Sequence, residues 1–211
     1  MHELIVYLEP NRTCALRHCL DQFLLETAPR FYLSTAIKYP PHVSVTGFFK
    51  VNSQLELNSI LAAYDGALTS TNDFPTASLT PLLVPTTPPT ALSSKHLLLP
   101  VTVPACLHDR LTQCAYDINK AMSVHIRPKR MDHISLAYWD EPQATPLETD
   151  AWLAWCNGPE METMKQEMMH QLGSIDDSDT SWAIVLYERI HQGTAVGEKH
   201  QFQELSRWLI S

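Results

Sequence analysis

The sequence predicts one α+β domain over residues 1–211, built as two duplicated lobes with pseudo-twofold symmetry, at approximately residues 1–90 and 91–211. Each lobe is expected to contribute an antiparallel sheet with flanking helices, and C-terminal segments could cross back to the first lobe. Two observations predict this arrangement. The order strand, helix, strand occurs in both halves, and in each half the second strand carries a His-x-Ser triplet, within PPHVSVTGFF (residues 40–49) and MDHISLAYW (residues 131–139).

The first half opens with a short apolar strand, Leu4 to Leu8, which ends at Pro10. Residues 11–27 predict a helix, because apolar side chains recur there at every third or fourth position. The strand around His42 follows. The remaining elements expected in this half and at its border are a helix over residues 53–66 and strands over 78–84 and 97–103.

The second half repeats this order after Pro104. Apolar periodicity predicts a helix over residues 105–122, and the strand 131–139 then carries His133. Residues 81–104 are rich in proline, which suits a stiff connection between the lobes or strands at a sheet edge. The later elements expected are helices over 148–156 and 160–171, a strand over 182–190, and a segment at 202–210 that fits either a closing strand or a short helix.

Composition and charge narrow the class of protein. Hydrophobic residues make up 45% and charged residues 18% of the chain, which is typical of an ordered protein. The net charge of −8 argues against a protein that coats DNA or RNA, and leaves a small nucleotide or an RNA end as a compatible partner. Apolar runs are too short for a membrane span or a signal peptide. Five cysteines without CxxC spacing predict reduced thiols and a cytoplasmic or nuclear location, and we expect a monomer.

The two His-x-Ser triplets place polar side chains on strands that are otherwise apolar. His42 and Ser44 are two positions apart, so both point to the same face of their strand, and His133 and Ser135 repeat this spacing. One triplet arises readily by chance in a chain with ten histidines. Two triplets at equivalent places in a duplication are far less expected by chance, so the pair predicts an active site.

Two histidines that face each other can act as a general base and a general acid. Each has an unperturbed pKa of about 6.5, so one can be neutral while the other is protonated near neutral pH. The base would take a proton from water, the acid would give one to a departing oxygen, and the serine hydroxyls would hold the other oxygens of a phosphate. The sequence does not decide which histidine has which role. No metal or other cofactor is expected, because the chain has no HExxH motif and its acidic residues do not cluster near the triplets.

The segments HVSV, starting at His42, and HISL, starting at His133, resemble the paired His-x-Ser/Thr-x motifs of the 2H phosphoesterase superfamily, which includes cyclic phosphodiesterase-like proteins. The resemblance covers nearly the whole chain, because its size, the spacing of the motifs and the duplication all fit. It implies a bilobal fold with an active-site groove between the lobes, metal-independent hydrolysis of phosphodiesters, and catalysis by the two histidines together with Ser44 and Ser135.

This resemblance implies an enzyme that hydrolyses 2′,3′-cyclic phosphates of nucleotides or RNA ends. Two alternatives stay open. One is a phosphodiesterase for 2′-5′ oligonucleotides or RNA 3′ ends, since HISLAYW is similar to the second motif of the RNA 3′-end-trimming branch. The other is a module that binds RNA or a nucleotide without turning it over, although the intact pair of motifs counts against it. The chain departs from many bacterial relatives at Gly47, where they carry an aromatic residue.

Aromatic residues beside the motifs are candidates for substrate binding. Tyr138 and Trp139 end the second motif and Tyr39 precedes the first, so all three could stack on a base or line the mouth of the groove. Packing in the core or on the surface is the alternative for each. His96 and His125 are expected to be surface histidines or to have structural partners.

Basic residues form one dense cluster, at Arg127, Lys129 and Arg130, directly before the second motif. An acidic protein needs a local positive field to hold a phosphate, and this cluster could supply it. A solvated loop is the alternative for the cluster. We therefore count Arg127 and Arg130 among the candidate substrate-binding residues.

Overall fold

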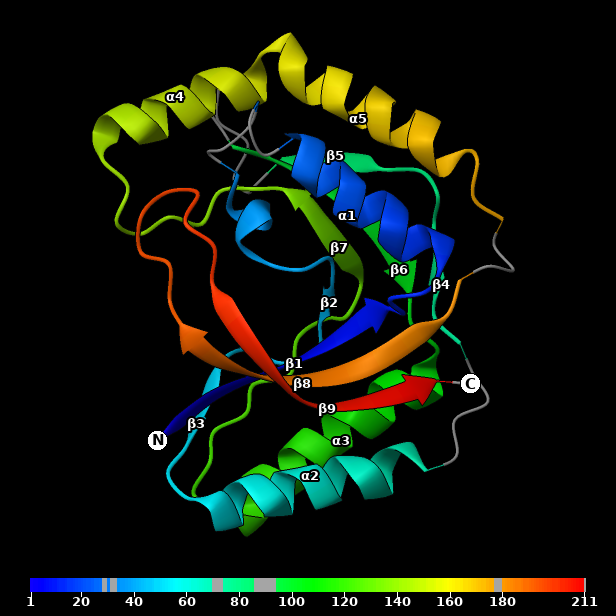
Figure 1. The fold of residues 1–211 in the computed structure, drawn as a ribbon, viewed down its shortest axis with the longest axis vertical. Helices are drawn as coiled ribbons and strands as arrows, with labels where there is room; N and C mark the ends of the chain where they lie inside the picture. Colours follow the sequence, from blue (N-terminus) through cyan, green and yellow to red (C-terminus); the bar gives the residue numbers. More distant parts are fainter. Residues whose placement is uncertain (28–29, 31–33, 70–73, 86–93, 177–179, 211) are drawn as a thin grey trace.

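The computed structural model describes residues 1–210 except 28–29, 31–33, 70–73, 86–93 and 177–179. These residues form a mixed α+β fold with five α-helices and nine antiparallel strands (Figure 1). The strands are β1 (His2–Pro10), β2 (Val43–Ser44), β3 (Phe49–Val51), β4 (Thr76–Ala77), β5 (Leu82–Pro85), β6 (Lys95–Thr102), β7 (His133–Ala137), β8 (Trp182–His191) and β9 (Gln201–Ile210). The helices are α1 (Ala15–Thr27), the 3-10 helix η1 (Thr35–Lys38), α2 (Gln54–Leu68), α3 (Ala105–Ala121), α4 (Pro146–Asn157) and α5 (Pro159–Leu172).

The strands join in the order β4-β6-β7-β2-β1-β8-β9, while β3 pairs with β1 and β5 pairs with β6. Strands from the two halves of the chain meet where β2 pairs with β7. The C-terminal strands return to the first half of the chain, because β8 pairs with β1 and β9 pairs with β8. The two His-x-Ser triplets therefore lie near the middle of this strand order.

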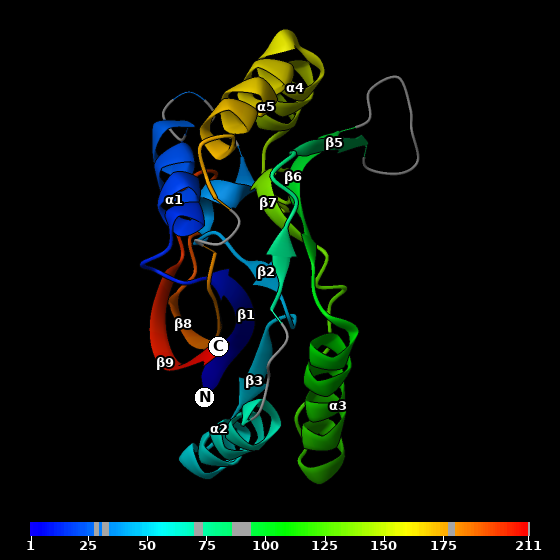
Figure 2. The ribbon, with the colours of Figure 1, turned by 90° about the vertical axis from the view of Figure 1, so that its right-hand side faces the viewer.

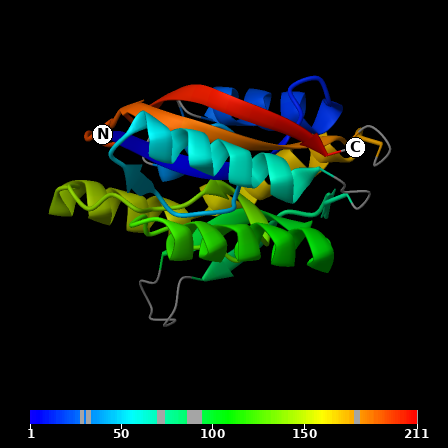
Figure 3. The same cartoon turned by 90° about the horizontal axis from the view of Figure 1, so that it is seen from below.

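Helices cover the sheet at two ends. Helices α1, α4 and α5 lie together at one end, and α2 and α3 lie at the other (Figures 1 and 2). Seen from below, α2 and α3 run side by side (Figure 3). The apolar faces of these helices pack into one large core cluster with the strands, which includes Leu20 of α1, Ile60 of α2 and Leu111 of α3.

Strand β1 is buried on both faces, and its two faces belong to different clusters. Leu4, Val6 and Leu8 point into the main core beneath α1. Ile5 and Tyr7 point to the other face, where they pack with residues of β8 such as Tyr187 in a smaller cluster. Because side chains alternate along a strand, this second face is the one that β1 shares with the polar side chains of β2.

Most sequence-based elements are confirmed, and the differences have local causes. Residues 202–210 form strand β9, because they pair along most of their length with β8. Of the predicted strand 78–84, only residues 82–84 are in a strand, β5; β4 ends just before the predicted range, and both strands pair with β6. The strand around His42 is shorter than expected, since only Val43 and Ser44 are in the ladder. Within the proline-rich connection 81–104, Pro88, Pro89 and the expected lobe boundary lie outside the described residues.

No helix in the described part of the chain is both long and apolar enough to span a lipid bilayer.

Candidate functional site

The two His-x-Ser triplets pair with each other across the centre of the sheet. The middle residues of the triplets are direct partners in the antiparallel ladder, Val43 opposite Ile134. Both are fully buried in the main core. The residues on either side of this pair therefore point to the opposite face of the sheet, with His42 next to Ser135 and Ser44 next to His133. The local alternation of the strands brings all four polar side chains together.

These four side chains line a pocket of about 350 Å³, which we call the histidine pocket. It lies on the face of the sheet that carries Tyr7, because Tyr7 is the ladder partner of Ser44. The pocket is lined by His42, Val43, Ser44, His96, Lys129, Arg130, Met131, Asp132, His133, Ser135, Tyr138 and Asp140. It thus combines three histidines, two serine hydroxyls, one tyrosine, two basic side chains and two carboxylates.

The ring of His42 is held by a hydrogen bond to a backbone carbonyl two residues earlier. Its Nδ1 lies 2.7 Å from the carbonyl oxygen of Pro40, so Nδ1 carries a proton and donates it. The ring stacks on Tyr7, with centroids 3.6 Å apart and planes 26° from parallel. Burial disfavours the charged ring and lowers the pKa of His42 to about 4. His42 is therefore neutral near pH 7, and its Nε2 is an unprotonated acceptor.

His133 has a charged partner where His42 has a neutral one. Its Nδ1 lies 2.6 Å from Oδ1 of Asp132, so it donates to a carboxylate. Asp132 also pairs with Arg130, whose Nε is 3.4 Å from Oδ2. The residue before Asp132, Met131, is buried and has a φ of 55°, a left-handed conformation that non-glycine residues seldom adopt. The two histidines thus differ in the charge of the group that holds them.

The two serines also differ in their partners. Oγ of Ser135 lies 3.1 Å from Nε2 of His96, whereas the hydroxyl of Ser44 makes no hydrogen bond to the described residues. The His96 ring lies edge-on to His133, with centroids 5.1 Å apart. Burial is the largest cause that lowers the pKa of His96 to about 4, followed by the nearby His133. His96 is therefore a neutral member of the site.

Sequence reasoning expected His96 to be a surface histidine or to have a structural partner, and the structure shows that its partner is Ser135, one of the four motif side chains. The expected strand 97–103 began one residue after His96, whereas β6 begins at Lys95. Because β6 pairs with β7, Leu98, two residues after His96, lies opposite Ser135. In the sequence, His96 is a polar residue at the start of an apolar strand. This feature indicates a place in the site only when the strand is known to pair with β7. His125, by contrast, is exposed, as expected.

The basic segment before the second triplet is hydrogen-bonded to the residues that directly follow the first triplet, between β2 and β3. Gly47 donates its backbone N–H to the carbonyl of Arg127, and Lys129 donates to the carbonyl of Val45. This places Lys129 and Arg130 on the wall of the histidine pocket, whereas Arg127 lies against Gly47 and does not line it. Burial and the charge of Arg127 lower the pKa of Lys129.

The three aromatic candidates lie in three different environments. Tyr138 lines the histidine pocket, and its ring lies 5.3 Å from that of His96. Trp139 stacks on Trp152, with centroids 5.6 Å apart and planes 17° from parallel, and packs against the main core. Tyr39 lines a second pocket that adjoins the histidine pocket at Asp140. The structure therefore brings Tyr138, and not Trp139, to the four motif side chains.

No group of three or more His, Cys, Asp or Glu side chains within the described residues is arranged to hold a metal ion.

The half-buried histidines make stability depend on pH. The pKa values of His42 and His96 are about 4 in the folded protein, below the ordinary 6.5. Above pH 6.5 both states are neutral, and between 6.5 and 4 only the unfolded chain takes up the protons, so the free energy of unfolding falls as pH falls through this window. His96→Asn should reduce this loss by roughly 2 kcal/mol between pH 7 and 4.5, measured by denaturant unfolding. The control is His125→Asn, in which the free energy of unfolding should fall by as much as in the wild type. If it also falls by the wild-type amount in His96→Asn, the prediction is wrong.

Comparison with known proteins identifies no relative: no protein-family model matches the chain, and no curated protein does.

Proposed function

We propose that this protein is a 2H-type phosphodiesterase that hydrolyses 2′,3′-cyclic phosphates of nucleotides or RNA ends. His42 acts as the general base and His133 as the general acid. The observation that carries this proposal is the cross-paired arrangement of the triplets, with a neutral histidine and a carboxylate-bound histidine in one pocket. An acid and a base of the same residue type need different surroundings, and these two histidines have them.

The assignment of roles follows from the hydrogen bonds at Nδ1. His42 donates Nδ1–H to a carbonyl and is neutral, which leaves Nε2 free to accept a proton. His133 donates Nδ1–H to the Asp132 carboxylate, which holds the ring so that Nε2 is the nitrogen left for the substrate. Its Nε2–H can then be given away. A bound phosphodiester anion would raise the pKa of His42 by charge attraction and make it a stronger base.

The proposed reaction is a displacement at phosphorus by water. His42 takes a proton from the water as its oxygen bonds to phosphorus, and the bond from phosphorus to one ribose oxygen breaks. His133 gives that oxygen its proton, which yields a nucleoside phosphate monoester. His42 then carries the proton taken from water, while His133 has lost its proton to the product, and exchange with solvent restores both rings.

The other side chains of the pocket hold and neutralise the phosphate in this proposal. The hydroxyls of Ser44 and Ser135 flank the two histidines and can donate to the oxygens that do not react. The neutral His96 can accept or donate at Ser135 and so orients its hydroxyl. Lys129 and Arg130 supply positive charge at the wall of the pocket, in a protein whose net charge is −8.

The interpretation of the fold as two duplicated lobes belongs to the same proposal. In that reading β2 and β7 are equivalent strands, and a twofold axis would pass near the Val43–Ile134 pair. The symmetric placement of a His and a Ser on each side of this pair supports it. The groove between the lobes would then contain the histidine pocket.

The proposal is tested by incubating the purified protein with the four 2′,3′-cyclic mononucleotides, 2′-5′ oligonucleotides and RNA with defined 3′ ends, each with and without EDTA. We expect the cyclic mononucleotides to be opened to monoesters, with the rate unchanged by EDTA, because the two histidines supply the acid and the base. Loss of all turnover in EDTA would contradict the two-histidine mechanism. Binding of these nucleotides without turnover of any would instead favour the non-catalytic module.

A further inference from the structure

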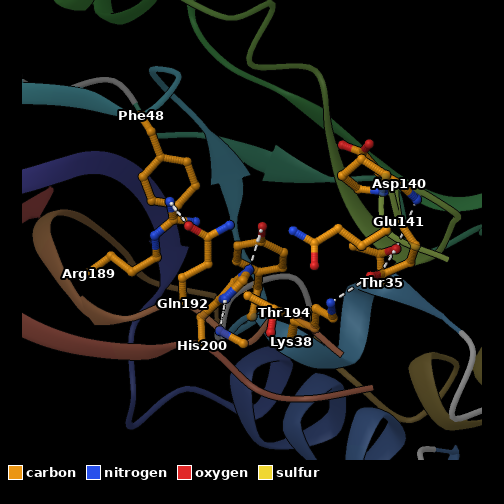
Figure 4. A pocket seen from close by; sticks show the side chains of 13 residues that line it. Thr35, Lys38, Phe48, Asp140, Glu141, Arg189, Gln192, Thr194 and His200 are labelled. Carbon is orange, nitrogen blue, oxygen red and sulfur yellow. Dashed lines mark hydrogen bonds and ion pairs between the residues drawn. The ribbon is translucent and has the colours of Figure 1, made fainter. Parts of the chain in front are cut away.

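A second pocket of about 200 Å³ adjoins the histidine pocket, and we call it the Tyr39 pocket. Figure 4 shows Phe48 and Arg189 on one side of it and Asp140 and Glu141 on the other. Asp140 lines both pockets, and the rings of Tyr39 and His42 lie 5.7 Å apart. A molecule whose phosphate lies at His42 could therefore place its next group in the Tyr39 pocket.

The hydrogen bonds around His200 determine that His200 donates to Tyr39, and not the reverse. The backbone N–H of Gly193 donates to Nδ1 of His200, so Nδ1 is unprotonated. Burial lowers the pKa of His200 to about 4, so the neutral ring carries its single proton on Nε2, which donates to the Tyr39 oxygen at 3.0 Å. Burial also raises the pKa of Tyr39 to about 12. Tyr39 thus keeps its own proton, and that proton has no acceptor among the described residues.

Two more unused donors lie beside Phe48. The guanidinium of Arg189 lies over the Phe48 ring, 3.9 Å from its centroid, and the Arg189 side chain is only 8% exposed. Its Nε and Nη2 donate to Glu3, and Nη2 also donates to Oε1 of Gln192. Nη1 of Arg189 and Nε2 of Gln192 make no hydrogen bond to the described residues. Both residues line the Tyr39 pocket.

The carboxylates on the opposite side of the pocket differ in their availability. Glu141 is already bound, because it accepts from Lys38 at 2.6 Å and from Thr35 at 3.0 Å. The Asp140 carboxylate is exposed and accepts no hydrogen bond from the described residues. The pocket therefore offers flat aromatic surfaces, several unused donors on one side and one unused carboxylate on the other.

We propose that the Tyr39 pocket binds the base of the substrate nucleotide and prefers a base whose edge carries a carbonyl oxygen beside an N–H, as in uracil and guanine. This inference rests on the proposed function, because it places the phosphate of the same nucleotide in the histidine pocket. The carbonyl oxygen accepts from Tyr39 or Gln192, and the neighbouring N–H donates to Asp140, which is close enough to Tyr39 for the two to interact electrostatically. Cytosine and adenine present an amino group and a bare ring nitrogen there, the reverse pattern. They would leave the half-buried Tyr39 hydroxyl without an acceptor, which is costly.

The test compares uridine 3′-monophosphate with cytidine 3′-monophosphate, which have the same phosphate and sugar, by isothermal titration calorimetry. We expect the wild-type protein to bind the uridine nucleotide about tenfold more tightly, the size of effect that one well-placed hydrogen bond gives. Tyr39→Phe keeps the ring and removes the donor, and should bring the two dissociation constants close together. Tyr116→Phe makes the same chemical change at a tyrosine that is 55% exposed on α3, and should keep the wild-type ratio.

The outcomes separate this inference from the proposed function. Equal affinities in the wild type, no binding of either nucleotide, or an unchanged ratio in Tyr39→Phe would overturn the base pocket even if cyclic phosphates are hydrolysed. A uridine preference that is lost in Tyr39→Phe, in a protein that hydrolyses none of the tested diesters, would keep the base pocket and overturn the phosphodiesterase. Should Tyr39→Phe fail to fold, the exposed Gln192 allows a second variant, Gln192→Leu, which should also lower the ratio.

Discussion

His42→Ala should lower kcat for a 2′,3′-cyclic nucleotide by about 10²–10⁴-fold, the range that a positioned general base supplies. The reason is that His96, the other neutral imidazole among the described residues of the pocket, is committed to Ser135 and does not replace the lost base. The pH profile gives a second readout. The pKa of His42 is about 4, so wild-type kcat/KM should fall as pH falls through about 4 and the base becomes protonated. The variant should lack this dependence.

Two controls make the His42 result specific. Far-UV circular dichroism and the unfolding midpoint should show that His42→Ala is folded, because the variant removes a ring that stacks on Tyr7. His125→Ala changes an exposed histidine and should retain wild-type kcat. Near-normal turnover in a folded His42→Ala protein would show that His42 is not the base.

Local pattern predicted most of the helices, because their apolar stripes are visible without knowledge of their partners. It predicted their ends less well. Helix α4 begins at Pro146 and not at residue 148, since Thr145 and Glu148 form a reciprocal capping box there, a signal the sequence contains. Strands depend more on partners that lie far along the chain. The segment 202–210 has no clear alternation, and only its pairing with β8 makes it a strand.

The same distinction applies to the candidate site. The four motif side chains could be named from the sequence because the triplet is repeated, and the structure places all four in one pocket. The residues that accept from Nδ1 of the two histidines, Pro40 and Asp132, are also close to them in sequence. His96 could not be assigned in this way, because its contact with Ser135 exists only through the pairing of β6 with β7. The bond between Tyr39 and His200 likewise joins residues with no local relation.

His133→Ala should lower kcat for the cyclic nucleotide by about 10²–10⁴-fold as well, but for a different reason. Without an acid at this position, the ribose oxygen would have to leave as an unprotonated alkoxide. A substrate whose leaving group is a stable anion does not need that proton. We therefore expect His133→Ala to hydrolyse thymidine 3′-(4-nitrophenyl phosphate) at a rate within about tenfold of wild type, whereas His42→Ala should be impaired on both substrates.

This pair of substrates separates the two roles that the structure suggests. The deoxyribose ester has no 2′-hydroxyl, so release of 4-nitrophenolate, followed by its absorbance, reports attack by water alone. Rescue of His42→Ala and not of His133→Ala would mean that the base and the acid are exchanged. Failure to rescue either variant would mean that His133 contributes more than a proton, for example by holding the phosphate with its charge. Asp132→Asn tests the same role: it replaces the carboxylate that accepts from Nδ1 of His133 by a neutral amide, so its loss of activity should also be smaller on the nitrophenyl ester, which does not need the acid, than on the cyclic nucleotide.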